Sequence, residues 1–253
     1  ALKKCPNLEI VPPEHDYYHL QSSKLMNLLR SYTPDIEQVS VDECYMDFTG
    51  IQNMYESSLK AAYEIKDKVK KSFGFTVNIG ISDVKVLAKM ASDFEKPDKV
   101  HTLYKHEIRE KMWPLPIEEL FMAGKSSVDT LHKLGIFTIG QLAQSPVNIL
   151  ETHLKSHGRT LWEYANGIDD SVVNPIIEDL KGVGNSVTLP NDLDNIEEIE
   201  KVLLMLSEKV AGRLRAGKQL AKTVAVEIKY NDFTKTSKQT TFEGQTDSGT
   251  EIY

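Results

Sequence analysis

The sequence predicts an α+β protein built from consecutive parts of different texture. Helical periodicity and strand alternation follow one another between residues 17 and 93, whereas only helical patterns occupy residues 117–167. A long amphipathic helix followed by two strands then fills residues 196–242. Helices that cover one face of a mostly antiparallel sheet are typical of α+β domains. We therefore expect domains at 1–114, 115–175 and 191–253, with a linker at 176–190.

The first part has the order helix, hairpin, helix, strand and helix. The expected elements are a helix at 17–31, two short strands within 36–48, a helix around 59–69, a strand at 75–81 and a helix around 86–90. Apolar residues recur every three or four positions in the helices and every second position in the 75–81 strand. Ser82 or Asp83 precedes the last helix, and both residue types are common helix caps.

The remaining parts are separated by proline and glycine. Pro114 and Pro116 interrupt the pattern and indicate a boundary, and the helical segments that follow predict a small all-helical domain. The stretch around 176–190 is polar and broken, which favours a linker. Beyond it, a helix covers 196–210 and strands at 223–230 and 237–242 pair across a turn.

Composition narrows the class of protein. The formal net charge is −7, which argues mildly against a nucleic-acid partner. Residues 209–238, however, hold eight basic side chains against two acidic ones. No apolar run reaches the roughly 18 residues of a membrane helix, so we expect a cytoplasmic protein without a membrane partner. Two cysteines are expected as free thiols, and their spacing does not favour zinc.

An acidic pair, Asp42 and Glu43, lies where the two first strands meet. Strands usually avoid acidic residues, so carboxylates beside an apolar alternation are unusual. Adjacent side chains reach one site only near a turn or bulge. Carboxylate oxygens suit Mg²⁺, which takes one or two of them together with substrate phosphates. The pair alone is also typical of a solvated hairpin tip, and by itself it favours that simpler interpretation.

Further motifs favour a functional site over a solvated hairpin tip. The sequence contains Ser-Val-Asp-Glu at 40–43, Gly-Ile-Ser-x-x-Lys-x-Leu-Ala-Lys-x-Ala-Ser-Asp at 80–93 and Lys-Pro at 96–97. In this order and spacing they resemble the Y-family (translesion) DNA polymerases, in particular the bacterial DNA polymerase IV (DinB-like) and UmuC-like branch. The resemblance continues through 115–120, 134–143 and 181–186, and covers essentially the whole chain.

The resemblance implies roles for residues of the first domain, which would be an incomplete polymerase palm. Asp42 and Glu43 would be catalytic carboxylates that hold metal, with two Mg²⁺ ions in the complete enzyme. Lys96 would bind the triphosphate of the incoming nucleotide, and a compact ammonium suits that role. Ser40 lies beside the metal site in the family pattern. Asp47 is a candidate third carboxylate, although the pattern favours a structural role for it.

The resemblance also implies DNA contacts. Residues 115–175 would be the thumb, with a helix-hairpin-helix turn at 121–125, where Met122 replaces one of the two usual glycines and Gly124 remains. Backbone N–H groups at Gly124, supported by Lys125, would hold a DNA phosphate without reading sequence. Residues 191–253 would be an incomplete little finger. Its predicted phosphate contacts are Arg213, Arg215, Lys218, Lys222 and Lys229.

The implied function is template-directed, low-fidelity DNA synthesis by two-metal nucleotidyl transfer. Primer-template DNA and deoxynucleoside triphosphates would be its substrates, a sliding clamp would be a partner of the full-length protein, and a bacterial protein would work at the nucleoid. The main alternative is a non-catalytic DNA-binding or regulatory relative, which the presence of Asp42 and Glu43 disfavours. A nucleotide cyclase is a third interpretation, which the helical and basic domains disfavour.

The resemblance finally implies that family elements lie outside this sequence. The first metal-binding aspartate, the sugar gate and the fingers would precede the Ala-Leu-x-x-Cys-Pro segment at 1–6, and the little finger would continue beyond residue 253. We therefore expect an incomplete polymerase chain that has no polymerase activity by itself.

Overall fold

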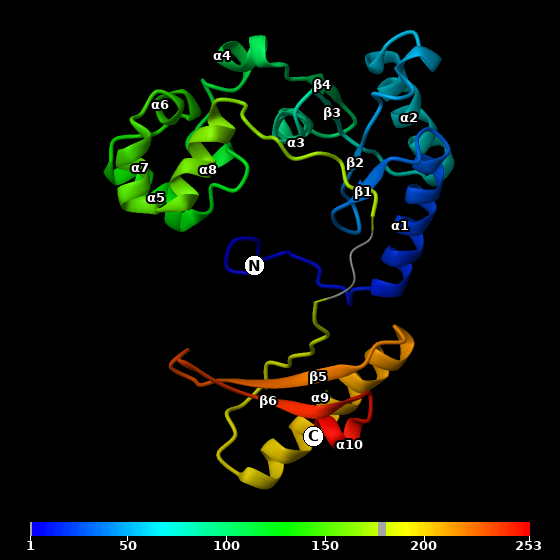
Figure 1. Cartoon of the computed structure of the whole chain (residues 1–253), viewed down its shortest axis with the longest axis vertical. Helices are drawn as coiled ribbons and strands as arrows, with labels where there is room; N and C mark the ends of the chain where they lie inside the picture. Colours follow the sequence, from blue (N-terminus) through cyan, green and yellow to red (C-terminus); the bar gives the residue numbers. More distant parts are fainter. Residues whose placement is uncertain (1, 177–180) are drawn as a thin grey trace. The chain divides into compact units, whose positions relative to one another are not determined.

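The computed structural model describes residues 2–176 and 181–253 (Figure 1). Contacts divide the chain into two compact units, with the division between residues 177 and 178, and each unit is described by itself. Both contain helices and strands, which confirms the predicted α+β class. The expected linker at 176–190 includes residues 177–180, which lie outside the described residues. The expected boundary at residue 114 lies inside the first unit and stays a prediction.

The first half of the first unit follows the predicted order. Its elements are α1 (His15–Arg30), β1 (Ile36–Gln38), β2 (Cys44–Met46), the short 3₁₀ helix η1 (Gln52–Met54), α2 (Ser58–Phe73), β3 (Ile79–Ile81), α3 (Lys85–Asp93) and β4 (Val100–Thr102). Ser57 caps α2 by accepting a hydrogen bond from the Lys60 N–H at 3.1 Å. Gly74 ends α2 with φ of 78°.

The strand pairing differs from the expectation of a mostly antiparallel sheet. The hairpin β1–β2 is antiparallel and pairs Ile36 with Met46, but β3 pairs with β4 in parallel, in a separate two-stranded sheet. The strand expected at 75–81 is also too long, because only its last three residues enter the ladder. Phe75 and Val77 pack against the buried cluster of α1 and α2 instead. Their alternation therefore reflects side-chain packing without strand pairing.

The second half of the first unit is helical between residues 117 and 165, as predicted. Its elements are η2 (Lys105–Glu107), α4 (Ile108–Lys111), η3 (Ile117–Glu119), α5 (Lys125–Lys133), α6 (Ile139–Ala143), α7 (Val147–Leu154) and α8 (Ser156–Ala165). Thr138 begins α6 with a capping box in which Gln141 is the reciprocal partner. The Trp113 indole donates a hydrogen bond to the Ala165 carbonyl at 3.0 Å and joins the two ends of this half.

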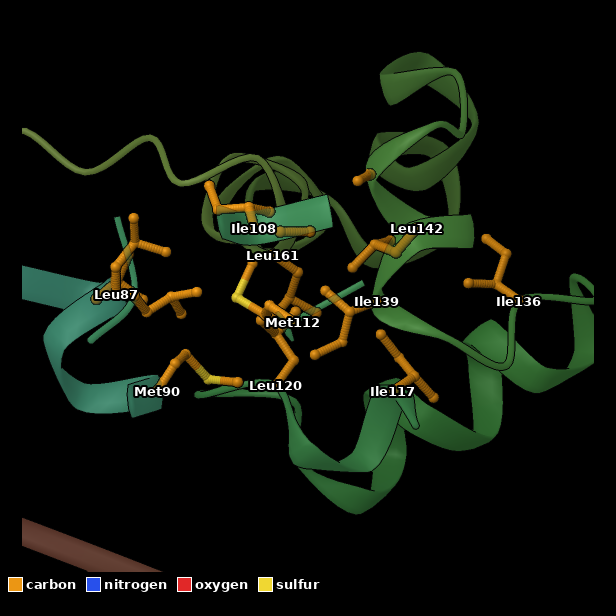
Figure 2. Close-up of a cluster of buried hydrophobic side chains, with 14 of the residues drawn as sticks. Leu87, Met90, Ile108, Met112, Ile117, Leu120, Ile136, Ile139, Leu142 and Leu161 are labelled. Carbon is orange, nitrogen blue, oxygen red and sulfur yellow. The ribbon is translucent and has the colours of Figure 1, made fainter. Parts of the chain in front are cut away.

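One continuous apolar cluster runs from α3 into the helical half. Figure 2 shows Leu87 and Met90 of α3 on the same cluster as Met112, Ile139 and Leu161. These side chains are almost completely buried. Burial of one such side chain contributes roughly 1.5–3 kcal/mol. The position of α3 is therefore fixed by packing against residues that lie far along the chain.

The start of α3 is capped from a distance. The expected caps were Ser82 and Asp83, but the Val86 N–H donates to Asp169 Oδ2 at 3.0 Å. Ser82 accepts from the Val84 N–H at 3.3 Å and donates to the Leu103 carbonyl, so it closes the turn before the helix. The local cap prediction was wrong because a residue beyond α8 supplies the carboxylate.

The second unit contains α9 (Ile196–Ala216), β5 (Ala221–Lys229), β6 (Lys235–Thr246) and α10 (Gly249–Ile252). The antiparallel ladder runs from Thr223 opposite Thr241 to Lys229 opposite Lys235, which confirms the predicted helix and strand pair. Ala211, Leu214 and Ile252 form its small buried cluster. Within the described residues, every helix is too short or too polar to cross a bilayer.

Close contact between β3 and α3 leads to a stability prediction. A Cβ at Gly80 would lie 1.9 Å from the Ala88 carbonyl oxygen and 2.6 Å from the Ser92 nitrogen. We expect Gly80→Ala to lower the free energy of unfolding by about 1–3 kcal/mol, because backbone atoms must move apart. Denaturant titration measures this change. Gly50→Ala is the matched control, since a Cβ at Gly50 meets nothing within 4 Å, and equal destabilisation by both variants would contradict the prediction.

Candidate active site and nucleic-acid contacts

The acidic pair lies at the tip of the β1–β2 hairpin. The Val39 and Ser40 N–H groups both donate to the Glu43 carbonyl, at 3.0 and 3.2 Å, and close the turn. The Ser40 hydroxyl donates to Asp42 Oδ1 at 2.6 Å and accepts from the Glu43 N–H at 3.1 Å. Ser40 therefore organises the turn and orients the Asp42 carboxylate.

A chain of alternating charges connects the hairpin tip to the loop after α3. Lys89 Nζ lies 2.5 Å from Glu43 Oε1 and 3.2 Å from Asp93 Oδ2. Asp93 Oδ1 in turn lies 2.7 Å from Lys96 Nζ. The structure thus joins two of the predicted site residues, Glu43 and Lys96, through two residues of α3 that the sequence analysis did not select.

The two intermediate residues are charged at neutral pH. Burial opposes ionisation of Lys89, but hydrogen bonds to Glu43 and Asp93 outweigh it and raise the pKa of the ammonium. Burial also opposes ionisation of Asp93, yet hydrogen bonds from Lys96 and Lys89 lower the pKa of that carboxyl. Lys89 is thus a fixed positive charge beside Glu43, and Asp93 holds Lys96 near the hairpin.

A second lysine of α3 holds the base of the same hairpin. Lys85 Nζ lies 2.7 Å from Glu37 Oε2 in β1, and also donates to the Val172 carbonyl at 3.2 Å. The Asn174 N–H donates to the same Glu37 oxygen at 2.7 Å. Burial by itself raises the pKa of Glu37. The hydrogen bonds from Lys85 and Asn174 lower that pKa by more, so it lies below its usual value. Glu37 therefore ties both α3 and the segment after α8 to the hairpin.

Only Asp42 and Glu43 offer anionic ligands at the tip. Burial raises the pKa of the adjacent Cys44 thiol to about 11 and that of Tyr45 to about 12, so both remain protonated at neutral pH. Asp47 accepts the Thr49 N–H at 2.7 Å, which closes the turn after β2 and supports its structural role. The described residues contain no group of three or more His, Cys, Asp or Glu suited to a metal.

This donor set fits a hard divalent cation that also binds substrate. Mg²⁺ is usually held by one or two carboxylates plus phosphate oxygens and water, and the pair at the tip supplies two carboxylates. The Lys89 ammonium already compensates Glu43, so a cation that binds there competes with this ion pair. The arrangement is suited to a metal that arrives together with a phosphate ligand.

The predicted phosphate-binding turn has an unusual backbone at the position of the missing glycine. Met122 adopts φ of 70°, a left-handed conformation that suits glycine, and 55% of the residue is exposed. Gly124 has φ of −70° and begins α5, where its carbonyl accepts from the Ser127 and Val128 N–H groups. Lys125 follows with a highly exposed side chain. The chain thus keeps the turn despite the substitution.

The predicted basic residues of the second unit occupy several elements. Arg213 donates to the Gly184 carbonyl at 2.6 Å, and Arg215 donates to the Asp247 carbonyl at 2.8 Å. Lys218 follows α9 with φ of 52°, and Lys222 lies in β5. Lys229 Nζ lies 4.4 Å from the centre of the Phe233 ring. The two arginines therefore bind different backbone segments and do not form one cluster.

The residues that the sequence analysis missed share a simple signal. Lys85, Lys89 and Asp93 recur every four positions, so they lie on one face of α3. That face contacts the hairpin carboxylates, while Leu87 and Met90 enter the core. The four-residue spacing of charges within the 80–93 motif would have identified them.

Comparisons with known proteins agree with these observations. The model of the impB/mucB/samB family matches residues 1–93, and that of the impB/mucB/samB family C-terminal domain matches residues 180–253. The chain is 48% identical to DNA polymerase IV of Clostridium acetobutylicum over 94% of this chain and 60% of that protein. It is 40% identical to DNA polymerase IV of Alkaliphilus oremlandii over 100% of this chain and 64% of that protein. The chain thus spans less than two thirds of these relatives.

Solved structures share the fold. A Y-family DNA polymerase chimera superposes with a TM-score of 0.83 at 24% identity, over 96% of this chain and 70% of that one. A DinB family error-prone DNA polymerase from Sulfolobus solfataricus gives a TM-score of 0.65 at 24% identity, over 99% of this chain and 74% of that one. At this identity the likeness concerns the fold alone.

The backbone at Met122 leads to a second stability prediction. We expect Met122→Gly to raise the free energy of unfolding by about 0.5–1 kcal/mol, because glycine adopts positive φ without the Cβ penalty. Chemical denaturation of the two proteins side by side measures the gain. Met122→Ala is the control, since alanine removes the same side chain but keeps the Cβ. A gain in the alanine variant equal to that of glycine would show that side-chain exposure, not backbone strain, is responsible.

Proposed function

We propose, from the premise that this chain belongs to the DinB-like branch of the Y-family DNA polymerases, that the full-length protein is a template-directed DNA polymerase of the translesion type. One observation carries the proposal. Glu43 at the hairpin tip is linked through Lys89 and Asp93 of α3 to Lys96. This link supports a metal at the Asp42 and Glu43 carboxylates and a nucleotide phosphate at Lys96. Primer-template DNA and deoxynucleoside triphosphates are the proposed substrates.

The proposed chemistry is nucleotidyl transfer. The primer 3′-hydroxyl loses its proton to solvent and attacks the α-phosphorus of the nucleotide, the bond from that phosphorus to the oxygen that bridges to the β-phosphorus breaks, and pyrophosphate leaves. Y-family polymerases use divalent metals, and we assign Mg²⁺ to the Asp42 and Glu43 carboxylates. A metal held by these carboxylates would stabilise the negative charge that develops during the transfer. Positioning of the substrates by the protein contributes the rest of the rate acceleration.

Three residues prepare the site before substrate arrives. Ser40 holds the Asp42 carboxylate through its hydroxyl, and Lys89 holds Glu43 beside α3. Lys96 is paired with Asp93, but 56% of its side chain is exposed, which leaves its ammonium accessible to a triphosphate. We propose that Lys96 exchanges part of its contact with Asp93 for phosphate oxygens when the nucleotide binds.

The proposed DNA contacts are independent of sequence. At the turn that precedes α5, Gly124 is exposed but its N–H donates to the Met122 carbonyl at 2.9 Å, so the exposed ammonium of Lys125 is the stronger candidate for a DNA phosphate. In the second unit, Arg213 and Arg215 each use one guanidinium nitrogen on a backbone carbonyl and retain other donors for phosphate. Lys218, Lys222 and Lys229 complete the proposed set. A sliding clamp as partner and the palm, thumb and little-finger assignments stay predictions.

Loss of the carboxylates is the decisive test of the enzyme. We expect Asp42→Ala combined with Glu43→Ala to reduce primer extension by the full-length protein on the order of 1,000-fold, because metal-ion stabilisation of the transferring phosphate is lost. Asp47→Asn is the matched control from the same hairpin, and it should retain activity since the amide oxygen still accepts the Thr49 N–H. Undiminished extension by the double variant would remove the site assignment and favour the non-catalytic alternative.

The DNA contacts are tested by salt dependence. We expect Lys222→Gln combined with Lys229→Gln to weaken binding of the full-length protein to primer-template and to flatten the slope of log affinity against log salt by about 2, since each lost phosphate contact removes roughly 0.9. Fluorescence anisotropy across a salt series measures both quantities. Lys60→Gln is the control, because Lys60 pairs with Glu56 in the first unit. An unchanged slope in the double variant would exclude these lysines.

A further inference from the structure

The loop between α3 and β4, which carries Lys96, is held on its far side by α2. Asp98 lies 3.0 Å from Lys66 Nζ and 2.6 Å from Lys70 Nζ through its two carboxylate oxygens. The side chains of Lys66 and Asp98 are only 11% and 18% exposed. These contacts join residues 28 and 32 positions apart in the sequence. The cluster has no part in the chemistry proposed above.

The backbone at Asp98 depends on this cluster. Asp98 has φ of 64°, a left-handed conformation that is unfavourable for residues other than glycine. Such a conformation persists where surrounding contacts over-determine it. Two ammonium groups one helical turn apart on α2 supply that constraint, because they bind the Asp98 carboxylate from both oxygens.

The other end of the loop is fixed as well. Asp93 is the last residue of α3, and it binds Lys96 at 2.7 Å and Lys89 at 3.2 Å. At the last residue of the loop, the Lys99 N–H donates to Asn78 Oδ1 at 3.1 Å. Lys96 therefore lies between two anchored carboxylates, one held by α3 and the other by α2.

We propose that Lys66 is a positioning residue for nucleotide binding, which acts through Asp98 on the loop that presents Lys96. Lys70 assists from the next turn of α2. The inference rests on the proposed contact of Lys96 with the triphosphate. Lys66 pairs with Asp98 in the loop and, at 2.8 Å, with the neighbouring Asp67 of α2, but not with the residues of the hairpin tip. Its removal therefore affects how well the nucleotide is bound and leaves the rate of transfer at saturation intact.

The experiment uses the full-length protein with Lys66→Met, which keeps the length of the side chain and removes its charge. We expect the KM for the incoming nucleotide to rise about tenfold with kcat within about twofold of the parent value. Lys66→Arg should restore most of the affinity, since the guanidinium also donates to a carboxylate. Lys71→Met on the same helix is the control, because Lys71 makes no ion pair among the described residues. A fall in kcat without a change in KM would overturn the proposal.

A second variant separates positioning from a loss of folding. Asp98→Gly removes the carboxylate but places glycine at a φ of 64° that glycine adopts readily. We expect its KM to rise as in Lys66→Met while the melting temperature does not fall. An unchanged KM in Asp98→Gly would show that Lys66 does not act through Asp98, and would overturn the proposal.

A double-mutant cycle connects Lys66 to Lys96. If Lys66 acts through Lys96, Lys66→Met adds nothing to the KM effect of Lys96→Met. Additive effects, or a KM unchanged by Lys96→Met, would overturn the inference. Equilibrium titration with a fluorescent deoxynucleoside triphosphate gives Kd for the same variants without catalysis. If the full-length protein extends no primer, the proposed function fails, and the Kd series still decides the inference by itself.

Discussion

The position of the whole site depends on the packing of α3. One face of this helix buries Leu87 and Met90 in the apolar cluster, and the other face presents Lys85 and Lys89 to the hairpin. Burial of an apolar side chain contributes roughly 1.5–3 kcal/mol, whereas a partly exposed ion pair contributes about 0–1 kcal/mol. The core therefore decides where α3 lies, and the ion pairs decide how the carboxylates are oriented. Gly80 permits this placement, because only a residue without a Cβ fits beneath Ala88.

The charges around the site form a compensated series before any ligand binds. Glu43, Lys89, Asp93 and Lys96 alternate in sign, and each contacts the next. A divalent cation at Glu43 would displace Lys89, and a polyphosphate at Lys96 would displace Asp93. Each ligand carries more charge than the side chain that it replaces, with the same sign. The two ligands would act on the opposite ends of one series, so binding at either end changes the balance of charge at the other. This arrangement favours joint binding of metal and nucleotide over binding of either one.

Local periodicity predicted those features that local forces determine. The hairpin, α1, α2 and α9 follow from apolar spacing, and adjacent acidic residues required a turn, which places Asp42 and Glu43 correctly at the tip. Long-range contacts left no such signal. Asp169 caps α3 from 83 residues away, and β3 pairs in parallel with a strand of three residues. The link from Lys66 to Asp98 likewise joins two segments whose own patterns indicate only a solvated helix face and a loop.

The acidic pair at 42–43 and the 80–97 stretch differ in how specifically each one indicates the family. An acidic pair in a hairpin requires little of the rest of a protein, so it arises in many solvated turns. Three positions of the 80–97 stretch have contacts that limit their replacement: Gly80 lies against Ala88, Leu87 enters the core, and Lys89 holds Glu43. Their spacing is set by the helical repeat, because a shift of one residue would turn Lys89 away from the hairpin by about 100°. The motif is thus specific because packing and charge pairing must be satisfied by the same helix.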